Sequence, residues 1–294
     1  GTGGLGGSFF MFNVDNTSQV LVDSGTRIYT PVESAFVVRA ETRLLNFSLV
    51  QSGASGSDWG VGGSLGINNI QNTTKAIINS GTIISGGALM LDAYDSTHQI
   101  TWAGGICYKG SVGVGTSWAV NNIQRETTAR LGRDPQETDN EQTVQADQVR
   151  HVAAKSTGAL HSFSLSGAVA AKNPVRSKGS SPEIPFEAAG SVSLNLMQTK
   201  TQALVTGLKD PQGGSAQGDM LVSALEDTSM FALSGAVALA FPTTTDGAGG
   251  LAFSFAYNAM SGFTKAKVED SELRNRKQLA VRSQRTGKIL LGHN

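Results

Sequence analysis

Apolar and polar residues follow one pattern five times along the chain, first recognised as the near copies at 16–26 and 72–82. The five segments align on Val20, Ala76, Ala129, Ala203 and Ala266, at spacings of 56, 53, 74 and 63 residues. Two positions before each anchor stands Ser or Thr (Ser18, Thr74, Thr127, Thr201, Thr264), and two positions after it a large aliphatic residue (Val22, Ile78, Leu131, Val205, Val268). Residues two apart share one face of a β-strand. The pattern therefore predicts a half-buried strand in every repeat, with Thr74, Ala76 and Ile78 inside and Lys75 outside.

Short alternating runs flank each anchor segment. An asparagine lies seven or eight residues upstream, in the series Asn13, Asn69, Asn122, Asn195 and Asn258. Two further runs follow downstream, such as 36–40, 88–93 and 220–224, then 100–105, 163–168 and 231–236. Glycine, serine and asparagine separate the runs and are typical of turns. Each repeat is therefore expected to contain about four short strands and to supply two turns of a coil.

Recurring columns of one residue type indicate a β-solenoid, in which equivalent residues of successive units stack about 4.8 Å apart. Threonine columns and asparagine ladders would then pair along the stacking axis. The whole chain, 1–294, is interpreted as a single solenoid segment with approximate repeats 1–56, 57–109, 110–183, 184–246 and 247–294. The longer spacings predict insertions near 132–148, 173–187, 210–218 and 242–250, which protrude and are the expected binding elements.

One repeat of the chain consists of an alternating run, then 68–78 (NNIQNTTKAII), then Ser-Gly-Thr at 80–82 and the run 88–93. This repeat resembles the repeats of very large bacterial exoproteins. These are the filamentous-haemagglutinin-like adhesins and the leukotoxin-type passengers of two-partner and autotransporter export. The resemblance covers most of the chain. It implies an all-β, right-handed parallel β-helix that is secreted or exposed at the bacterial cell surface.

Composition narrows the class of protein. Lys plus Arg and Asp plus Glu are equal at 23 each, so no net charge attracts the chain to nucleic acid. Glycine is abundant at 36 residues, as expected for an all-β chain with many turns. The single cysteine, Cys107, excludes an intrachain disulfide and is expected to be a small buried side chain. No initiator methionine, leader or apolar run of membrane-helix length is present in the sequence, which suggests a mature product or an excised piece.

Motifs for cofactors and metals are weak. The glycines at 1–6 fit G-x-G-x-x-G, but a strand-like run follows them, which favours a glycine-rich turn over a dinucleotide site. The four histidines, His98, His151, His161 and His293, show no metal-ligand spacing. We therefore expect no catalytic, cofactor-binding or metal-binding residues and no cofactor.

Three sets of charged or modifiable residues could be functional sites, but each is better explained as ordinary surface. Asp92, Asp95 and His98 could form a carboxylate cluster of a carbohydrate-active β-helix, but Glu41, Arg43, Glu226 and Asp227 in other repeats favour a recurrent solvated corner. A basic patch near the end of the sequence (Arg274, Arg276, Lys277, Arg282, Arg285, Lys288) lacks the interleaved aromatic residues that stack on nucleic-acid bases. The sequons at Asn16, Asn46 and Asn72 carry no weight in a bacterial protein.

The preferred hypothesis is a non-enzymatic structural or adhesive segment, a rigid rod that displays its insertions to a host surface, extracellular matrix or sister chains. It predicts no nucleic-acid partner and no membrane insertion. The first alternative is a transmembrane β-barrel, because 229–239 and 250–257 alternate like outer-membrane strands. The second is a carbohydrate-active β-helix enzyme.

Overall fold

A computed structural model of the chain describes residues 3–108, 112–134, 143–171, 185–210, 218–241, 248–274 and 276–293. These residues form twelve strands. They are β1 (Gly3–Val22), β2 (Arg27–Tyr29), β3 (Ala35–Ser55), β4 (Trp59–Ile78), β5 (Ile83–Tyr108), β6 (Val112–Gly132), β7 (Val144–Ala171), β8 (Phe186–Thr206), β9 (Leu208–Lys209), β10 (Met220–Phe241), β11 (Gly249–Glu269) and β12 (Leu279–His293). The described residues include no helix long and apolar enough to cross a membrane.

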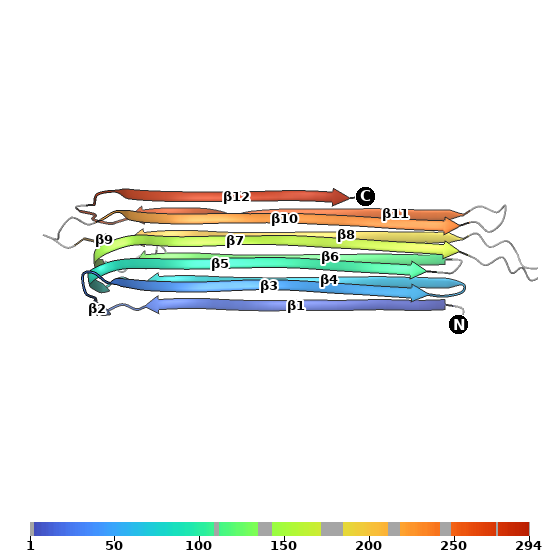
Figure 1. Ribbon diagram of the computed structural model, residues 1–294, viewed down its shortest axis with the longest axis horizontal. Coiled ribbons are helices and arrows are strands. Elements are labelled where there is room, and N and C mark those ends of the chain that lie inside the picture. The colour runs from blue at the N-terminus through green and yellow to red at the C-terminus, as the bar shows by residue number, and fades with distance from the viewer. Residues whose placement is uncertain are drawn as a thin grey trace, which may run out of the picture.

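The strands form two parallel sheets (Figure 1). Sheet A has the order β1-β4-β6-β8-β11, and sheet B the order β12-β10-β7-β5, where β5 also pairs with β2 and β3. Successive long strands alternate between the sheets and run in opposite directions, while neighbours within a sheet are parallel. The prediction of an all-β chain with parallel strands is confirmed. The sheets do not close into a barrel, so the alternative fold is wrong.

Sheet A pairs the repeats in the register that the sequence pattern predicts. Val20 lies opposite Ala76, Ala76 opposite Ala129, Ala129 opposite Ala203 and Ala203 opposite Ala266. Thr74, Ala76 and Ile78 are fully buried between the sheets. Lys75 points outward and keeps 29% of its side chain exposed. The predicted inner and outer faces of this strand are therefore confirmed.

The repeated Ser-Gly-Thr segments form turns that carry the chain from sheet A to sheet B. Gly25 and Gly81 have φ angles of 79° and 76°, a left-handed conformation that residues with a Cβ rarely adopt. The two turns are stacked, because the Gly25 backbone N–H donates to the Gly81 carbonyl oxygen at 3.3 Å.

Each repeat contains two long strands, and the expectation of four short strands and two turns of a coil is wrong. β4 has 20 residues and β5 has 26, and each spans two of the predicted runs. The glycine, serine and asparagine residues between those runs do not form turns. Every second one lies in the interior, where Gly62, Ser64, Gly66 and Asn68 lie opposite Gly115, Ser117, Ala119 and Asn121. Small inward residues let the two sheets approach each other at this end of the strands.

The interior has an apolar end, a polar middle and an end of small residues. The largest apolar cluster includes Ile78, Leu89, Leu131, Val152 and Val205 and lies beside β2 and β9. A smaller cluster of Ile70, Ile123, Leu160, Met197 and Met230 lies between two polar zones. Cys107 packs with Ala168 and Ala189 at the opposite end.

The longest dimension of the molecule lies along the strands (Figure 1). A 20-residue strand such as β1 extends about 66 Å, whereas five stacked strands span only about 20–25 Å. One copy of the chain is therefore a slab, and a rod along the stacking direction would need further copies. The predicted insertions fall largely on 135–142, 172–184, 211–217 and 242–247, which lie outside the described residues. Parts of the predicted insertions instead belong to strands: Gly132 ends β6, residues 144–148 begin β7, Phe186 and Glu187 begin β8, and Gly249 and Gly250 begin β11.

Candidate functional surfaces

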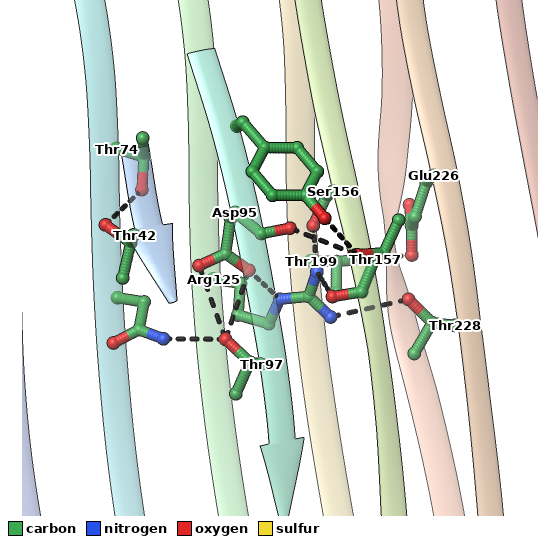
Figure 2. Close-up of polar contacts among 12 residues, drawn as sticks. Thr42, Thr74, Asp95, Thr97, Arg125, Ser156, Thr157, Thr199, Glu226 and Thr228 are labelled. Atoms are coloured by element: carbon green, nitrogen blue, oxygen red, sulfur yellow. Dashed lines mark hydrogen bonds and ion pairs between the residues drawn. The ribbon is translucent and has the colours of Figure 1, made fainter. Parts of the chain in front are cut away.

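A buried ion pair connects the two sheets at the middle of the strands (Figure 2). Arg125 enters from β6 and Asp95 from β5, with Nε and Oδ1 2.6 Å apart and side-chain exposures of 0% and 1%. The Arg125 guanidinium also donates to the Thr157 carbonyl oxygen at 2.8 Å and to the Ser156 hydroxyl. Every charged group of the pair is therefore engaged with protein, which makes it a structural contact between sheets.

A second buried carboxylate, Glu226 on β10, lies in the same column of sheet B. It accepts hydrogen bonds from the hydroxyls of Thr199 and Thr264, the latter at 3.0 Å. The Arg285 Nε lies 3.3 Å from its Oε2. Asp95 and Glu226 thus point inward from the middle of long strands, and the predicted solvated corner is wrong for both. The column holds Thr42, Asp95, Ser156, Glu226 and Arg285, whose polar groups pair across the interior.

An asparagine ladder runs through the interior next to the ionic zone. Asn68 donates to Asn121 at 2.8 Å, Asn121 to Asn195 at 2.7 Å and Asn195 to Asn258 at 2.7 Å. The ladder was predicted, but with partly wrong members. Asn13, Asn69 and Asn122 form a separate outward column, and Asn195 and Asn258 align with Asn68 and Asn121. In the sequence the two columns are hard to tell apart, because Asn68 and Asn121 of the inward column are each followed directly by an asparagine of the outward column.

Glu187 is the buried carboxylate without a hydrogen-bond partner among the described residues. It lies near the start of β8, opposite Gly113, in the zone of small interior residues. Burial raises its pKa from 4.5 to about 7, because an ionised carboxylate loses its hydration there. Sequence reasoning missed this group, since nothing in the pattern distinguishes it from a solvated glutamate.

Glu187→Gln is expected to stabilise the protein at pH 8 and to change little at pH 5. The folded-state pKa lies above the unfolded value, so the stability that protonation of Glu187 contributes is full below about pH 4.5 and is lost as pH rises through about 7. Thermal unfolding of both proteins at several pH values measures this. The gap between the two melting temperatures should widen from pH 5 to pH 8; a constant gap would contradict the assignment.

The candidate catalytic residues do not come together. Asp92 and His98 point outward from β5 at positions six residues apart, whereas Asp95 points inward. Asp92 instead binds His151, with Oδ1 and Nε2 2.8 Å apart, and this hydrogen bond raises the His151 pKa. His161 lies further along β7, against Phe231. The described residues contain no group of three or more His, Cys, Asp or Glu side chains that could hold a metal ion.

The remaining candidates also take structural positions. Cys107 is buried and its pKa is raised by burial. Gly3–Gly6 belong to β1 and are followed by more of that strand, so no helix N-terminus faces them. The basic residues near the C-terminus are dispersed: Arg276 pairs with buried Asp210, Arg274 with Glu272 and Arg285 with Glu226. Glu41 pairs with Arg39 and Arg43 on the outside of β3.

Charged side chains gather on one half of the molecule. This polar half comprises the parts of the long strands on the side of β2 and β9, including the ion pairs above. On the outside of sheet A, the Lys75 and Lys200 ammonium groups lie 3.3 and 3.1 Å from Glu126 Oε1. Partial burial opposes ionisation of Glu126, but the hydrogen bonds and charges of the two lysines hold its pKa below the ordinary value.

The other half, here called the apolar half, comprises described residues 3–13, 45–69, 98–108, 112–122, 159–171, 185–196, 229–241, 248–259 and 288–293. Its only Asp, Glu, Lys or Arg residues in the described chain are Asp58 in a turn, buried Glu187 and Lys288. Its outward side chains are largely aliphatic or aromatic on both sheets. The most exposed are Leu5, Phe9, Phe253 and Leu251 on sheet A, and Leu45, Phe47, Ile106 and Leu290 on sheet B.

Aromatic rings form a row on the outside of sheet B in the apolar half. Trp102 stacks on Phe163 with ring centroids 5.3 Å apart, and Phe163 contacts Phe231 at 5.6 Å. The three residues lie on β5, β7 and β10, so the row runs along the stacking direction. Such contiguous exposed apolar surface is uncommon on monomeric soluble proteins and marks an interaction surface.

Comparison with protein-family models, with curated proteins and with solved structures finds no match to this chain.

The edges of the sheets are a third candidate surface. Among the described strands, β1 and β11 are the outermost strands of sheet A, and β12 lies at one edge of sheet B with β2 and β3 at the other. Each outermost strand has one side with backbone N–H and C=O groups that pair with no other described strand. Such edges are templates for pairing with another strand.

Proposed function

We propose that the chain is a non-enzymatic structural and adhesive segment whose repeats stack end to end with those of further copies. The fold we propose for it is a right-handed parallel β-helix, each turn of which supplies one long strand to each sheet. The protein acts at the bacterial cell surface or after secretion. Its partners are sister chains and, through the assembled stack, a host surface or extracellular matrix.

The observation that carries this proposal is that the interior columns match between the two open edges. On β1, the inward residues of the polar half include Ser18, Val20 and Val22, and the corresponding residues of β11 are Thr264, Ala266 and Val268. A second copy placed on the β11 and β12 edge would continue these columns with hydroxyl on hydroxyl and aliphatic on aliphatic. In sheet B, Val281 of β12 would meet Val38 of β3, as Val38 meets Leu91 within the chain.

Backbone pairing gives such an interface its strength. β11 has 21 residues and β12 has 15, so a second copy would form two long parallel ladders at once. Burial of the edge would also cover the partly buried residues Val20, Val22, Ala266 and Val268, which pack against the largest apolar cluster. Edge strands of natural proteins are commonly blunted by proline, bulges or inward charges. β1, β11 and β12 contain no proline, and their one inward charge, Arg285, is paired with Glu226.

Val281→Asp is expected to block end-to-end assembly. Val281 is 48% exposed at the β12 edge, so a carboxylate there remains hydrated in a single copy. In a stack it would be buried against an aliphatic residue, at a cost of several kcal/mol. Sedimentation velocity and electron microscopy over a range of concentrations should show concentration-dependent particles that lengthen along the stack for the parent chain, and single slabs for the variant.

Gln284→Asp is the matched control, because Gln284 lies on the outward face of the same strand and stays hydrated in a stack. It should assemble like the parent chain. A parent chain that remains a single slab at every concentration would refute the proposal, as would assembly that both substitutions affect equally. Circular dichroism of each variant separates loss of assembly from loss of folding.

A further inference from the structure

The apolar half is bounded at the same level on both sheets. On sheet A, outward residues change from Met11 and Ile67 to Asp15 and Gln71 within four positions. On sheet B they change from Phe47 and Ile100 to Arg43 and Ser96. The two boundaries face each other, because Asn72, next to Gln71, donates to Thr97, next to Ser96, at 2.7 Å. A single plane across the strands therefore separates the apolar half from the polar half.

We propose that the apolar half enters the hydrocarbon core of a lipid bilayer, with the polar half in the water on one side. This differs from the sequence-based expectation of a chain that stays out of membranes. A partner protein seated on one sheet would require an apolar patch on that face alone. In the protein the apolar surface covers both outer faces and ends at one plane. A bilayer has the same geometry, because its hydrocarbon core ends at one plane on every side of an inserted protein.

The depth of the apolar half fits a bilayer. Its strand segments 45–55 and 98–108 contain eleven residues each, which extend about 36 Å at about 3.3 Å per residue. The hydrocarbon core of a bilayer is about 30 Å thick, and tilted β-strands of about 9–11 residues cross it. The turn at 56–58 brings Asp58 to the far end of this span, where headgroups and water would meet it.

Several inward polar groups of the apolar half are paired with each other, whereas the side chains of Ser8, Ser52, Ser64, Ser166 and Glu187 have no hydrogen-bond partner among the described residues; both kinds point between the sheets and would not face lipid. Asn68 donates to Asn121 and also to Thr101 at 3.0 Å, and Ser162 lies 2.8 Å from Ser193 between the sheets. Backbone groups within each sheet are paired along the strands. The outermost strands keep unpaired groups, which hydrocarbon does not tolerate. In this respect the inference rests on the proposed function, since end-to-end association supplies their partners.

The three tryptophans provide a direct test, because Trp59, Trp102 and Trp118 all lie in the apolar half and are partly exposed. The full chain is mixed with phosphatidylcholine vesicles and with vesicles whose acyl chains carry bromine. We expect flotation of the protein with the vesicles and at least a twofold loss of tryptophan emission in the brominated ones. Absence of both effects for the folded chain would overturn the inference.

Ile106→Glu and Ser96→Glu form a matched pair on β5. Both positions point outward, but Ile106 is 60% exposed within the apolar half and Ser96 lies in the polar half. A charge in the hydrocarbon core is costly, so Ile106→Glu should lower vesicle binding about tenfold or more, whereas Ser96→Glu should leave it unchanged. Equal effects would contradict the predicted orientation in the bilayer.

The competing occupant is a second copy packed face to face. In that case the tryptophan side chains would be shielded from water without vesicles, and Ile106→Glu would expose them to water. Adding lipid would not change the tryptophan emission, and this result would overturn the inference. The result also separates from the proposed function. Stacked particles that do not bind vesicles would refute only the bilayer inference. A parent chain that floats with the vesicles but never stacks would refute the stacking proposal and leave the orientation of the apolar half in the bilayer intact.

Discussion

Ile78→Asp is expected to leave the chain unfolded. Ile78 has no exposed surface and lies in a column with Val22, Leu131, Val205 and Val268, inside the largest apolar cluster. Removing the buried isoleucine costs about 2–5 kcal/mol, and burying an unpaired carboxylate costs several more. Native proteins are stable by only about 5–15 kcal/mol, so the sum reaches the whole margin. Loss of the β-type circular dichroism spectrum and of cooperative melting would be the measured result.

Lys75→Gln is the control for this substitution. Lys75 lies three residues earlier on β4, points outward and forms one partly exposed ion pair with Glu126, which keeps Lys200 as a second partner. Exposed pairs contribute about 0–1 kcal/mol, so the variant should melt close to the parent chain. Glutamine is preferable to aspartate here, because an aspartate would repel Glu126. Equal tolerance of Ile78→Asp and Lys75→Gln would refute the inner and outer faces described for β4.

The sequence predicted these faces because five copies of one pattern reveal which substitutions each position accepts. The Ser or Thr column and the aliphatic column tolerate only small changes, whereas Gln19, Lys75 and Thr128 share nothing but polarity. Pairing in the structure follows that alignment throughout sheet A. A repeat therefore supplies, within one chain, the comparison between positions that periodicity in a single strand lacks.

Strand length was predicted wrongly because small residues have two meanings. Glycine, serine and asparagine usually mark turns, and Gly25 and Gly81 do so here. Inside β4, however, Gly62 lies where a Cβ would be 2.7 Å from the Ile106 carbonyl oxygen of the facing sheet. The residue is small because the two sheets approach each other there. This distance between sheets is a tertiary property that no local pattern reports.

The candidate surfaces were harder to predict than the fold. Asp95 and Arg125 are 30 residues apart and come from different sheets, and the Arg125 column otherwise holds Asn16, Asn72, Thr199 and Gly262. No repeat pattern indicates that they meet. For the apolar half, the alternation in 229–239 and 250–257 is typical of lipid-facing strands. This pattern favours a closed barrel, whereas in the structure only every second residue, such as Val237 and Phe253, lies on the outside of two open sheets.

Arg125→Met is expected to destabilise the protein by about 3–5 kcal/mol, because it leaves Asp95 as a buried charge without its counterion. The Thr157 carbonyl oxygen and the Ser156 hydroxyl lose their donor at the same time. Methionine keeps much of the side-chain volume, so the effect is one of charge and hydrogen bonding more than of packing. Denaturant unfolding at a fixed pH measures the change in free energy.

A double-mutant cycle with Asp95→Leu identifies the source of that loss. Replacing a whole buried ion pair with apolar residues of similar volume is commonly neutral or stabilising, whereas removing one partner is strongly destabilising. The double variant Arg125→Met/Asp95→Leu should therefore recover most of the stability lost by Arg125→Met alone. The recovery should be incomplete, because Thr97 donates its hydroxyl to Asp95 at 3.1 Å and accepts from Asn72. Additive losses in the double variant would mean that Asp95 and Arg125 stabilise the sheets independently of each other. The ion pair between β5 and β6 would then not be what stabilises the middle of the strands.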